Sequence, residues 1–111
     1  MMFGFAEHRR GLLEAELVRM VEELPKLGVR RLYVAGDLAA RRVGAASELE
    51  LVVVFETPEP YRRRPDFFVD HLRPRVGTRF HVYTPEEFEA LAGRDPLLVE
   101  TLALGEPAYA G

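Results

Sequence analysis

The sequence predicts a single α/β (α+β) domain in which a small mixed sheet of three to four strands is flanked by helices. Three short apolar runs of strand length alternate with stretches that have helical periodicity or helix-capping residues. Gly and Pro separate almost every pair of these segments, and no internal repeat or low-complexity tract is present. With 111 residues, the chain is most simply one domain that spans residues 1–111.

The first predicted helix lies in the N-terminal quarter of the chain. Its apolar residues recur at the spacing of an amphipathic helix: Leu13, Leu17, Met20, Val21 and Leu24. Pro25 cannot continue this helix, and Gly28 supplies the break that follows it. The helix therefore ends before residue 25.

Two strands are predicted in the middle of the chain. Residues 29–35 form an apolar run that ends at Gly36, and residues 49–55 form a second one. Between them, Asp37 stands where the N-cap of a short helix over residues 38–42 is expected. The alternation of apolar and polar side chains around the second run predicts one half-exposed face.

The second half of the chain begins with a connector and a helix. Residues 57–60 (TPEP) are typical of a turn, and residues 64–75 have the inward-facing apolar spacing of a helix. Residues 78–83 are predicted to form the third strand.

Two further helices follow the third strand. Thr84 is an N-cap candidate, with Pro at the first helical position and a Glu that completes a capping box. This helix is expected to end at Gly93, and another is expected between Asp95 and Gly105.

Composition excludes some classes of function. The formal charge is only −3, so net charge gives no reason to expect a nucleic-acid partner. No segment approaches the roughly 20 apolar residues of a membrane span, so no membrane partner is expected. The absence of cysteine excludes disulfides and thiolate metal ligands, and a cytoplasmic location is expected.

The amino-acid usage also carries a hint about temperature. The chain has no Asn, Gln, Cys or Ile, and all but one of its 15 Lys and Arg residues are Arg. Loss of thermolabile side chains is typical of thermophile proteins, whereas codon bias in a GC-rich genome produces a similar pattern.

Residues 36–51, GDLAARRVGAASELEL, resemble the signature of the minimal nucleotidyltransferases of the polymerase-β-like superfamily. That signature is Gly-Ser, an Ala two positions on, a variable loop, and then Ser-Asp-x-Asp-Leu at the start of a strand. The matching positions here are Gly36, Ala39, Ser47 and Leu51, and the two Asp positions hold Glu48 and Glu50. Ser47 is the only serine in the chain.

The flanking segments extend the resemblance to about residues 15–109. The run LPKLGVRRLYVAG is similar to the family's helix, glycine and first strand. The run RFHVYTPEEFEAL is similar to its third strand and the helix after it, and LALGEPAYAG to its C-terminal Gly-x-x-x-Tyr. The resemblance therefore implies a nucleotidyltransferase-like fold for the whole domain.

By this resemblance, Glu48 and Glu50 are candidate catalytic residues and metal ligands, and Gly36, Asp37 and Ser47 stand at nucleotide-binding positions. The family's reaction uses two Mg²⁺ ions and a nucleoside triphosphate. Mg²⁺ demands oxygen ligands in octahedral geometry, and two carboxylates at i and i+2 of a strand point to one face.

The sequence departs from the family pattern at several of these positions. Each Glu moves its carboxylate outward by one methylene compared with Asp, and metal sites tolerate only about 0.5 Å of error. The third-carboxylate position holds His81, whose neutral imidazole is a poor ligand for Mg²⁺. Asp37 places an anion where a triphosphate would dock. We therefore expect a weakened catalytic site.

Simpler interpretations of the same residues stay open. Glu48 and Glu50 can be the solvent-facing residues of a strand, Asp37 a helix cap, and His81 an ordinary strand residue. The basic run over residues 62–64 can meet an acidic or phosphate-bearing partner, or it can be solvated surface.

Three functions are compatible with these observations. In the family, small members are often paired with a helical HEPN-type protein as an antitoxin–toxin couple, which implies a partner-binding, antitoxin-like role with little chemistry. The alternative is an active Mg²⁺-dependent enzyme that transfers a nucleoside monophosphate from an NTP to a protein or small-molecule hydroxyl. The third is an α/β interaction module without a nucleotide site, and a homo-oligomer is possible in each case.

Overall fold

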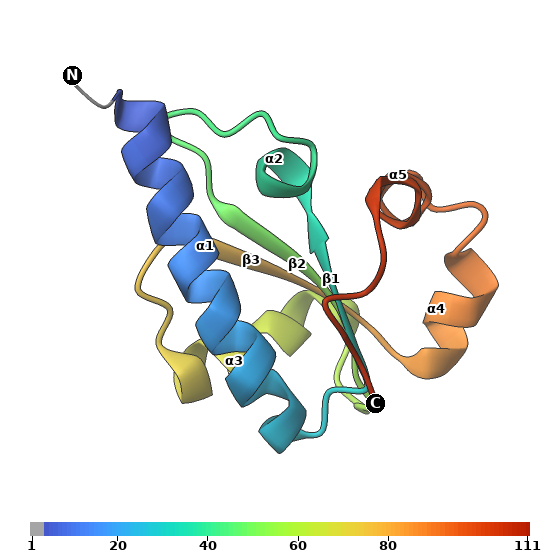
Figure 1. Ribbon diagram of the computed structural model, residues 1–111. Helices are drawn as coiled ribbons and strands as arrows, with labels where there is room; N and C mark the ends of the chain where they lie inside the picture. The colour runs from blue at the N-terminus through green and yellow to red at the C-terminus, as the bar shows by residue number, and fades with distance from the viewer. Residues whose placement is uncertain (1–3) are drawn as a thin grey trace.

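The computed structural model describes residues 4–111, and these form a four-stranded mixed sheet with helices on both faces (Figure 1). The strand order is β3-β2-β1-β4. Strand β1 runs antiparallel to both β2 and β4, whereas β2 and β3 are parallel. The expected fold class, a small mixed α+β sheet flanked by helices, is confirmed.

The element order also follows the expected alternation of helices and strands. The strands are β1 (Arg31–Ala35), β2 (Leu49–Val54), β3 (Thr78–Tyr83) and β4 (Tyr109–Ala110). The helices are α1 (Phe5–Glu23), α2 (Gly36–Ala39), α3 (Arg64–Leu72), α4 (Pro85–Leu91) and α5 (Pro96–Leu104). A short 3₁₀ segment, η1 (Leu24–Leu27), extends α1, and a second one, η2 (Tyr61–Arg63), precedes α3. Within residues 4–111, no helix has both the length and the apolar character needed to cross a membrane.

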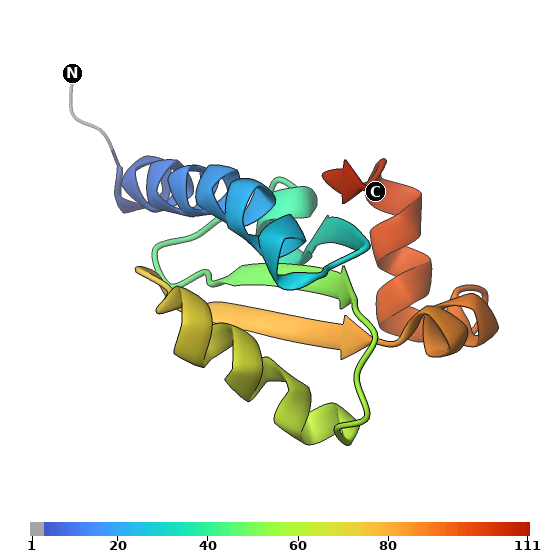
Figure 2. The same ribbon diagram turned by 90° about the horizontal axis from the view of Figure 1, so that it is seen from below.

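The domain has three layers, with α1 and α3 packed on one face of the sheet and α4 and α5 on the other. In Figure 2, the arrowheads of β2 and β3 point toward α4 and α5. The buried residues of α1 and α3, such as Leu13 and Phe68, pack with Leu49 and Leu51 of β2. On the opposite face, α4 and α5 pack on alternate residues of the strands, such as Val52. Helices cover both faces of β2, and this explains why the strand is an almost continuous apolar run.

Helix α3 ends earlier than the sequence predicts, at Leu72 rather than at residue 75. Arg73 adopts a left-handed conformation with φ of 46°, and Pro74 follows it. A residue that precedes proline is sterically disfavoured in the α-helical region, so the chain leaves the helix here.

The predicted role of Asp37 as an N-cap is wrong. Helix α2 begins at Gly36, its N-cap is Ala35, and no side chain caps it. The Asp37 carboxylate instead accepts a hydrogen bond from the hydroxyl of Ser47, 10 residues later in the chain. The Asp37 side chain therefore contributes to closing the loop after α2 and does not cap the helix.

The expected caps of the last two helices are confirmed. The Thr84 hydroxyl accepts from the N–H of Glu87, whose carboxylate accepts from the N–H of Thr84. The Asp95 side chain accepts from the N–H of Leu97 at the start of α5. These caps fix where the chain turns back over the sheet after β3.

The interpretation of residues 62–64 as one solvent-facing basic run is wrong for Arg64. Its guanidinium is buried and forms a two-pronged ion pair with Glu87, with N···O distances of 2.6 and 3.0 Å. It also donates to the carbonyl oxygens of Glu59 and Val82. Arg64 therefore joins α3, β3 and α4, while Arg62 and Arg63 remain exposed.

Candidate functional site

The candidate site residues gather at one edge of the sheet because of the strand directions. Since β1 is antiparallel to β2 and β2 is parallel to β3, the end of β1 lies beside the starts of β2 and β3. Ala35 pairs with Glu50, and Glu50 in turn pairs with Arg79. By strand alternation, Glu48 and Glu50 point to the face that carries α4 and α5.

Glu50 and His81 form the centre of this site. The Nε2 atom of His81 lies 3.1 Å from Oε1 of Glu50, and the side chains are 22% and 28% exposed. A carboxylate only accepts hydrogen bonds, so Nε2 carries the proton and donates. Glu50 is thus already satisfied by a basic partner on the neighbouring strand.

The turn at Gly36 lies directly against the same carboxylate. Gly36 has a φ of 66°, which an L side chain rarely adopts, and a Cβ added there would overlap Oε2 of Glu50. Glycine is required at this position for two separate reasons. The Glu50 carboxylate occupies the space beside the turn in which, by the resemblance, a phosphate would be expected.

Glu48 stands one residue before β2 and has its own basic partner. Its Oε1 atom accepts from Nε of Arg79 at 2.9 Å, and both side chains are exposed. The carboxylate also lies close to Gly77, where an added Cβ would come within 2.6 Å of Oε2. Glu48 and Glu50 thus share a face but bind different residues of β3.

Asp37 and Ser47 form a second cluster that closes the loop between α2 and β2. The Ser47 hydroxyl donates to Oδ2 of Asp37 at 2.7 Å and accepts from the N–H of Gly44 at 2.9 Å. The Ser47 carbonyl accepts from Nε of Arg9 at 2.7 Å, which attaches the loop to α1. Arg42 lies 3.9 Å from Oδ1 of Asp37. Ser47 is buried, so its hydroxyl acts here as a structural hydrogen-bonding group.

The structure therefore assembles the predicted site residues into two groups. Gly36, Glu50 and His81 form one group, Asp37 and Ser47 form the other, and Glu48 stands apart from both. Three arginines that contact the predicted site residues were not identified from the sequence: Arg9, Arg42 and Arg79. Arg79 and His81 are two residues apart on β3, so their side chains point to the same face of the sheet. This spacing is the sequence signal that could have identified Arg79.

The residues present do not suit a pair of Mg²⁺ ions. Among residues 4–111, no group of three or more His, Asp or Glu side chains is placed to hold a metal ion. A two-metal site needs several carboxylate oxygens that are free to bind the ions. Each of the two motif carboxylates instead binds a basic side chain of β3.

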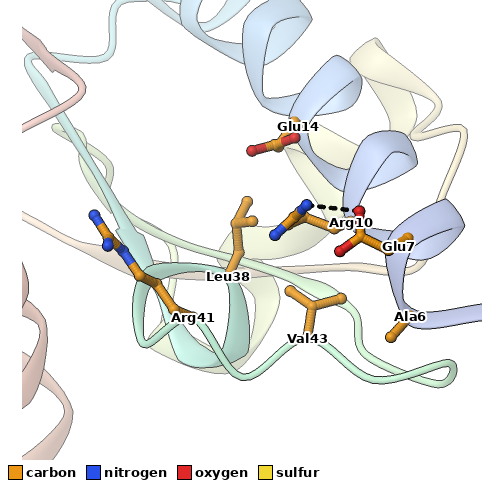
Figure 3. Close-up of a pocket in the computed structure, with 7 residues that line it drawn as sticks. All are labelled: Ala6, Glu7, Arg10, Glu14, Leu38, Arg41 and Val43. Atoms are coloured by element: carbon orange, nitrogen blue, oxygen red, sulfur yellow. Dashed lines mark hydrogen bonds and ion pairs between the residues drawn. The ribbon is translucent and has the colours of Figure 1, made fainter. Parts of the chain in front are cut away.

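A separate pocket of about 400 Å³ lies between α1 and the loop after α2 (Figure 3). Its charged side chains come from both elements and are of both signs: Glu7, Arg10, Glu14 and Arg41. The Arg10 guanidinium is paired with Glu7 at 2.7 Å. Because acidic and basic groups are balanced, this pocket has no electrostatic preference for a triphosphate.

No protein-family model, curated protein or solved structure matches the chain. The function is therefore inferred from the geometry of the site.

Proposed function

We propose that the chain is a nucleotidyltransferase-like domain with weakened catalysis that acts as a partner-binding, antitoxin-like protein for a helical HEPN-type companion. The observation that carries this proposal is the pairing of both motif carboxylates with basic residues of β3. His81 stands where the family has its third carboxylate, and it binds Glu50 at 3.1 Å.

Electrostatics explains why this pairing weakens the chemistry. A divalent cation that enters must displace Arg79 from Glu48 and His81 from Glu50, and then compete with the positive charge of Arg79. Because both side chains of the Arg79–Glu48 pair are exposed, this competition is worth only about 0–1 kcal/mol. Asp37 adds a like charge against an incoming triphosphate. Each of these interactions disfavours the binding of Mg²⁺-NTP.

A partner-binding role is supported by the surface formed by η2 and α3. Tyr61 of η2 and Phe67 of α3 are large apolar side chains that remain exposed there, and Val69 is exposed on the opposite flank of α3. Arg62 and Arg63 lie in the same segment and are also exposed. Apolar side chains beside two cations suit a helix of the companion that carries acidic residues at the rim of an apolar face.

The second candidate function is an active Mg²⁺-dependent nucleotidyltransferase. It is favoured by the shared face of Glu48 and Glu50, and by the exposure of Arg79, which allows its side chain to move away from Glu48. In that state Glu48 and Glu50 would hold the metal, and Gly36 and Ser47 would lie nearest the nucleotide.

Co-expression with a helical HEPN-type protein tests both candidates. The proposal expects a stable complex and no transfer of label from α-labelled ATP to the companion. The matched variant Glu48→Gln, Glu50→Gln should form the same complex, because neither residue belongs to the η2–α3 surface. Transfer of label by the wild type that is lost in the double variant would establish the enzyme instead. Failure to form a complex would contradict the partner-binding role.

A further inference from the structure

Helix α1 is joined by a polar contact to the segment that leads into β2, residues 43–48. The Nε atom of Arg9 donates to the carbonyl oxygen of Ser47 at 2.7 Å, across 38 residues of the chain. Ser47 directly precedes Glu48, the first of the two motif carboxylates. This contact therefore fixes the backbone of the β2 entry segment at the point where the candidate site begins.

A second set of contacts joins α1 to the segment that leads into β3, residues 73–77. The Glu16 carboxylate is only 3% exposed, and it accepts from the N–H of Arg75 at 2.6 Å and from the Arg19 guanidinium at 2.8 and 2.9 Å. Arg19 also donates to the carbonyl oxygen of Leu72 at the end of α3. A buried carboxylate that loses a donor keeps the full cost of its burial, so Glu16 holds the β3 entry segment firmly on α1.

The two entry segments also bind each other, at the edge of the sheet that carries the candidate site. The N–H of Leu49 donates to the carbonyl oxygen of Gly77 at 2.9 Å. Gly77 in turn lies against the Glu48 carboxylate. In Figure 2, both segments reach the sheet at the end that lies under the N-terminal half of α1. One helix therefore holds both segments that surround Glu48.

We propose that α1 is a two-point clamp on the candidate site, in which Arg9 and Glu16 hold the two entry segments together around Glu48. The contacts form a ring, from α1 to the β2 entry segment, then to the β3 entry segment and back to α1. Because no contact in such a ring can open far while the others hold, the two segments should open together. An opening would break the Leu49–Gly77 bond and free Glu48 from the β3 entry segment.

The Arg9 contact is the weaker point of the clamp. It is one hydrogen bond, whereas the buried Glu16 carboxylate accepts three. The pocket in Figure 3 lies between the same two segments, with Arg10 of α1 on one side and Val43 of the loop on the other. Separation of α1 from the loop across this pocket would stretch the Arg9 contact first. Such a displacement would reach Glu48 without contacting it. This inference concerns the geometry of the site and does not rest on the companion or on nucleotide binding.

Amide hydrogen exchange of the full chain, followed residue by residue by NMR, tests the clamp through one reporter at each point. In the β2 entry segment, the N–H of Gly44 is bound to the Ser47 hydroxyl at 2.9 Å. In the β3 entry segment, the N–H of Arg75 is bound to Glu16. The N–H of Phe55 is bound at the opposite end of β2, so it reports a general loss of stability.

A change at either point of the clamp should be measurable at the other. Arg9→Met should speed exchange at Arg75 by about tenfold or more, since a hydrogen bond to a charged group is worth at least about a factor of ten. Glu16→Gln should likewise speed exchange at Gly44, because coupling between two points is reciprocal. Exchange at Phe55 should change much less in both variants.

Arg10→Met is the matched control, since Arg10 is bound to Glu7 within α1, and this variant should leave both reporters unchanged. If Arg9→Met speeds exchange in the β2 entry segment alone, the two points are independent and the proposal is wrong. Acceleration at Phe55 as large as at the reporters would also overturn it, because the variants would then act on the whole fold. An equal effect of Arg10→Met would do the same.

Discussion

The imidazole of His81 and the carboxylate of Glu50 lie 3.1 Å apart across two parallel strands, on the face where the sequence leads us to expect a metal ion. By the resemblance to the minimal nucleotidyltransferases, the position of His81 would be expected to hold a third carboxylate. The same Glu50 carboxylate fills the space beside the turn at Gly36. The core of the site is therefore held together by its own side chains.

Gly36 should be the least replaceable residue of this site. Gly36→Ala introduces a side chain at a φ of 66° and against the Glu50 carboxylate, so we expect it to lower stability by about 1–3 kcal/mol. Gly44→Ala is the control, because a Cβ there meets nothing within 4 Å and should change stability by no more than about 0.5–1 kcal/mol. Urea denaturation of the two variants measures the difference. Equal effects would mean that the turn is not constrained by Glu50.

The consecutive arginines offer a second comparison within one short segment. Arg64→Met leaves Glu87 without its ion-pair partner and two carbonyl oxygens without their donor, so we expect a loss of about 2–4 kcal/mol. Arg62→Met changes an exposed side chain and should stay within about 0.5 kcal/mol of the wild type. Thermal denaturation of both variants measures the two losses of stability. A similar melting temperature for the two would contradict a structural role for Arg64.

Glu16 should make the stability of the domain sensitive to acid. Its buried carboxylate accepts two hydrogen bonds from Arg19 and one from the N–H of Arg75, and the Arg19 guanidinium in particular lowers the pKa of Glu16. A carboxylate whose pKa is lower in the folded state stabilises the fold above its unfolded pKa of about 4.3, and this contribution is lost as the pH falls through the folded value.

The melting temperature of the wild type should therefore fall between about pH 5 and pH 3 by more than that of Glu16→Gln, which has no such charge to lose. Glu14→Gln, at an exposed position of the same helix, should respond to acid like the wild type. Parallel acid profiles for the wild type and Glu16→Gln would show that other carboxylates determine the acid response.

The fold class could be predicted from the sequence because its signals are local. Residues 78–83 form the predicted third strand with the same bounds, and the caps at Thr84 and Asp95 start helices as expected. Helix and strand signals depend on neighbouring residues, so one chain is enough to detect them. The early end of α3 also has a local signal, Pro74, which the predicted range of 64–75 extends past.

The partners of the site residues could not be predicted from the sequence, because they come from distant segments. Ser47 binds Asp37 10 residues away, and Arg9 reaches Ser47 across 38 residues. Arg64 looks like its two neighbours in the sequence, yet only Arg64 is buried. Such pairings depend on how segments that are far apart in the chain meet in the fold, and local sequence patterns do not specify this.

The amino-acid usage leads to a prediction about heat. If the missing Asn, Gln and Cys reflect growth at high temperature, the domain should melt reversibly above the usual mesophile range of about 45–65 °C. Differential scanning calorimetry measures this midpoint directly. A midpoint inside the mesophile range would leave codon bias as the better explanation.

Calorimetric titration with Mg²⁺-ATP tests most directly whether charge placement limits nucleotide binding. The wild type should give weak heat or none. The variant Asp37→Ser, Glu48→Asp, Glu50→Asp, His81→Asp should gain measurable affinity, because it removes the repelling anion and supplies a third carboxylate. Its melting temperature should fall, because it loses the Asp37–Ser47 and His81–Glu50 hydrogen bonds, so circular dichroism at the titration temperature serves as the control for folding. Tight binding of Mg²⁺-ATP by the wild type would contradict the weakened site and would make Glu48 and Glu50 working ligands.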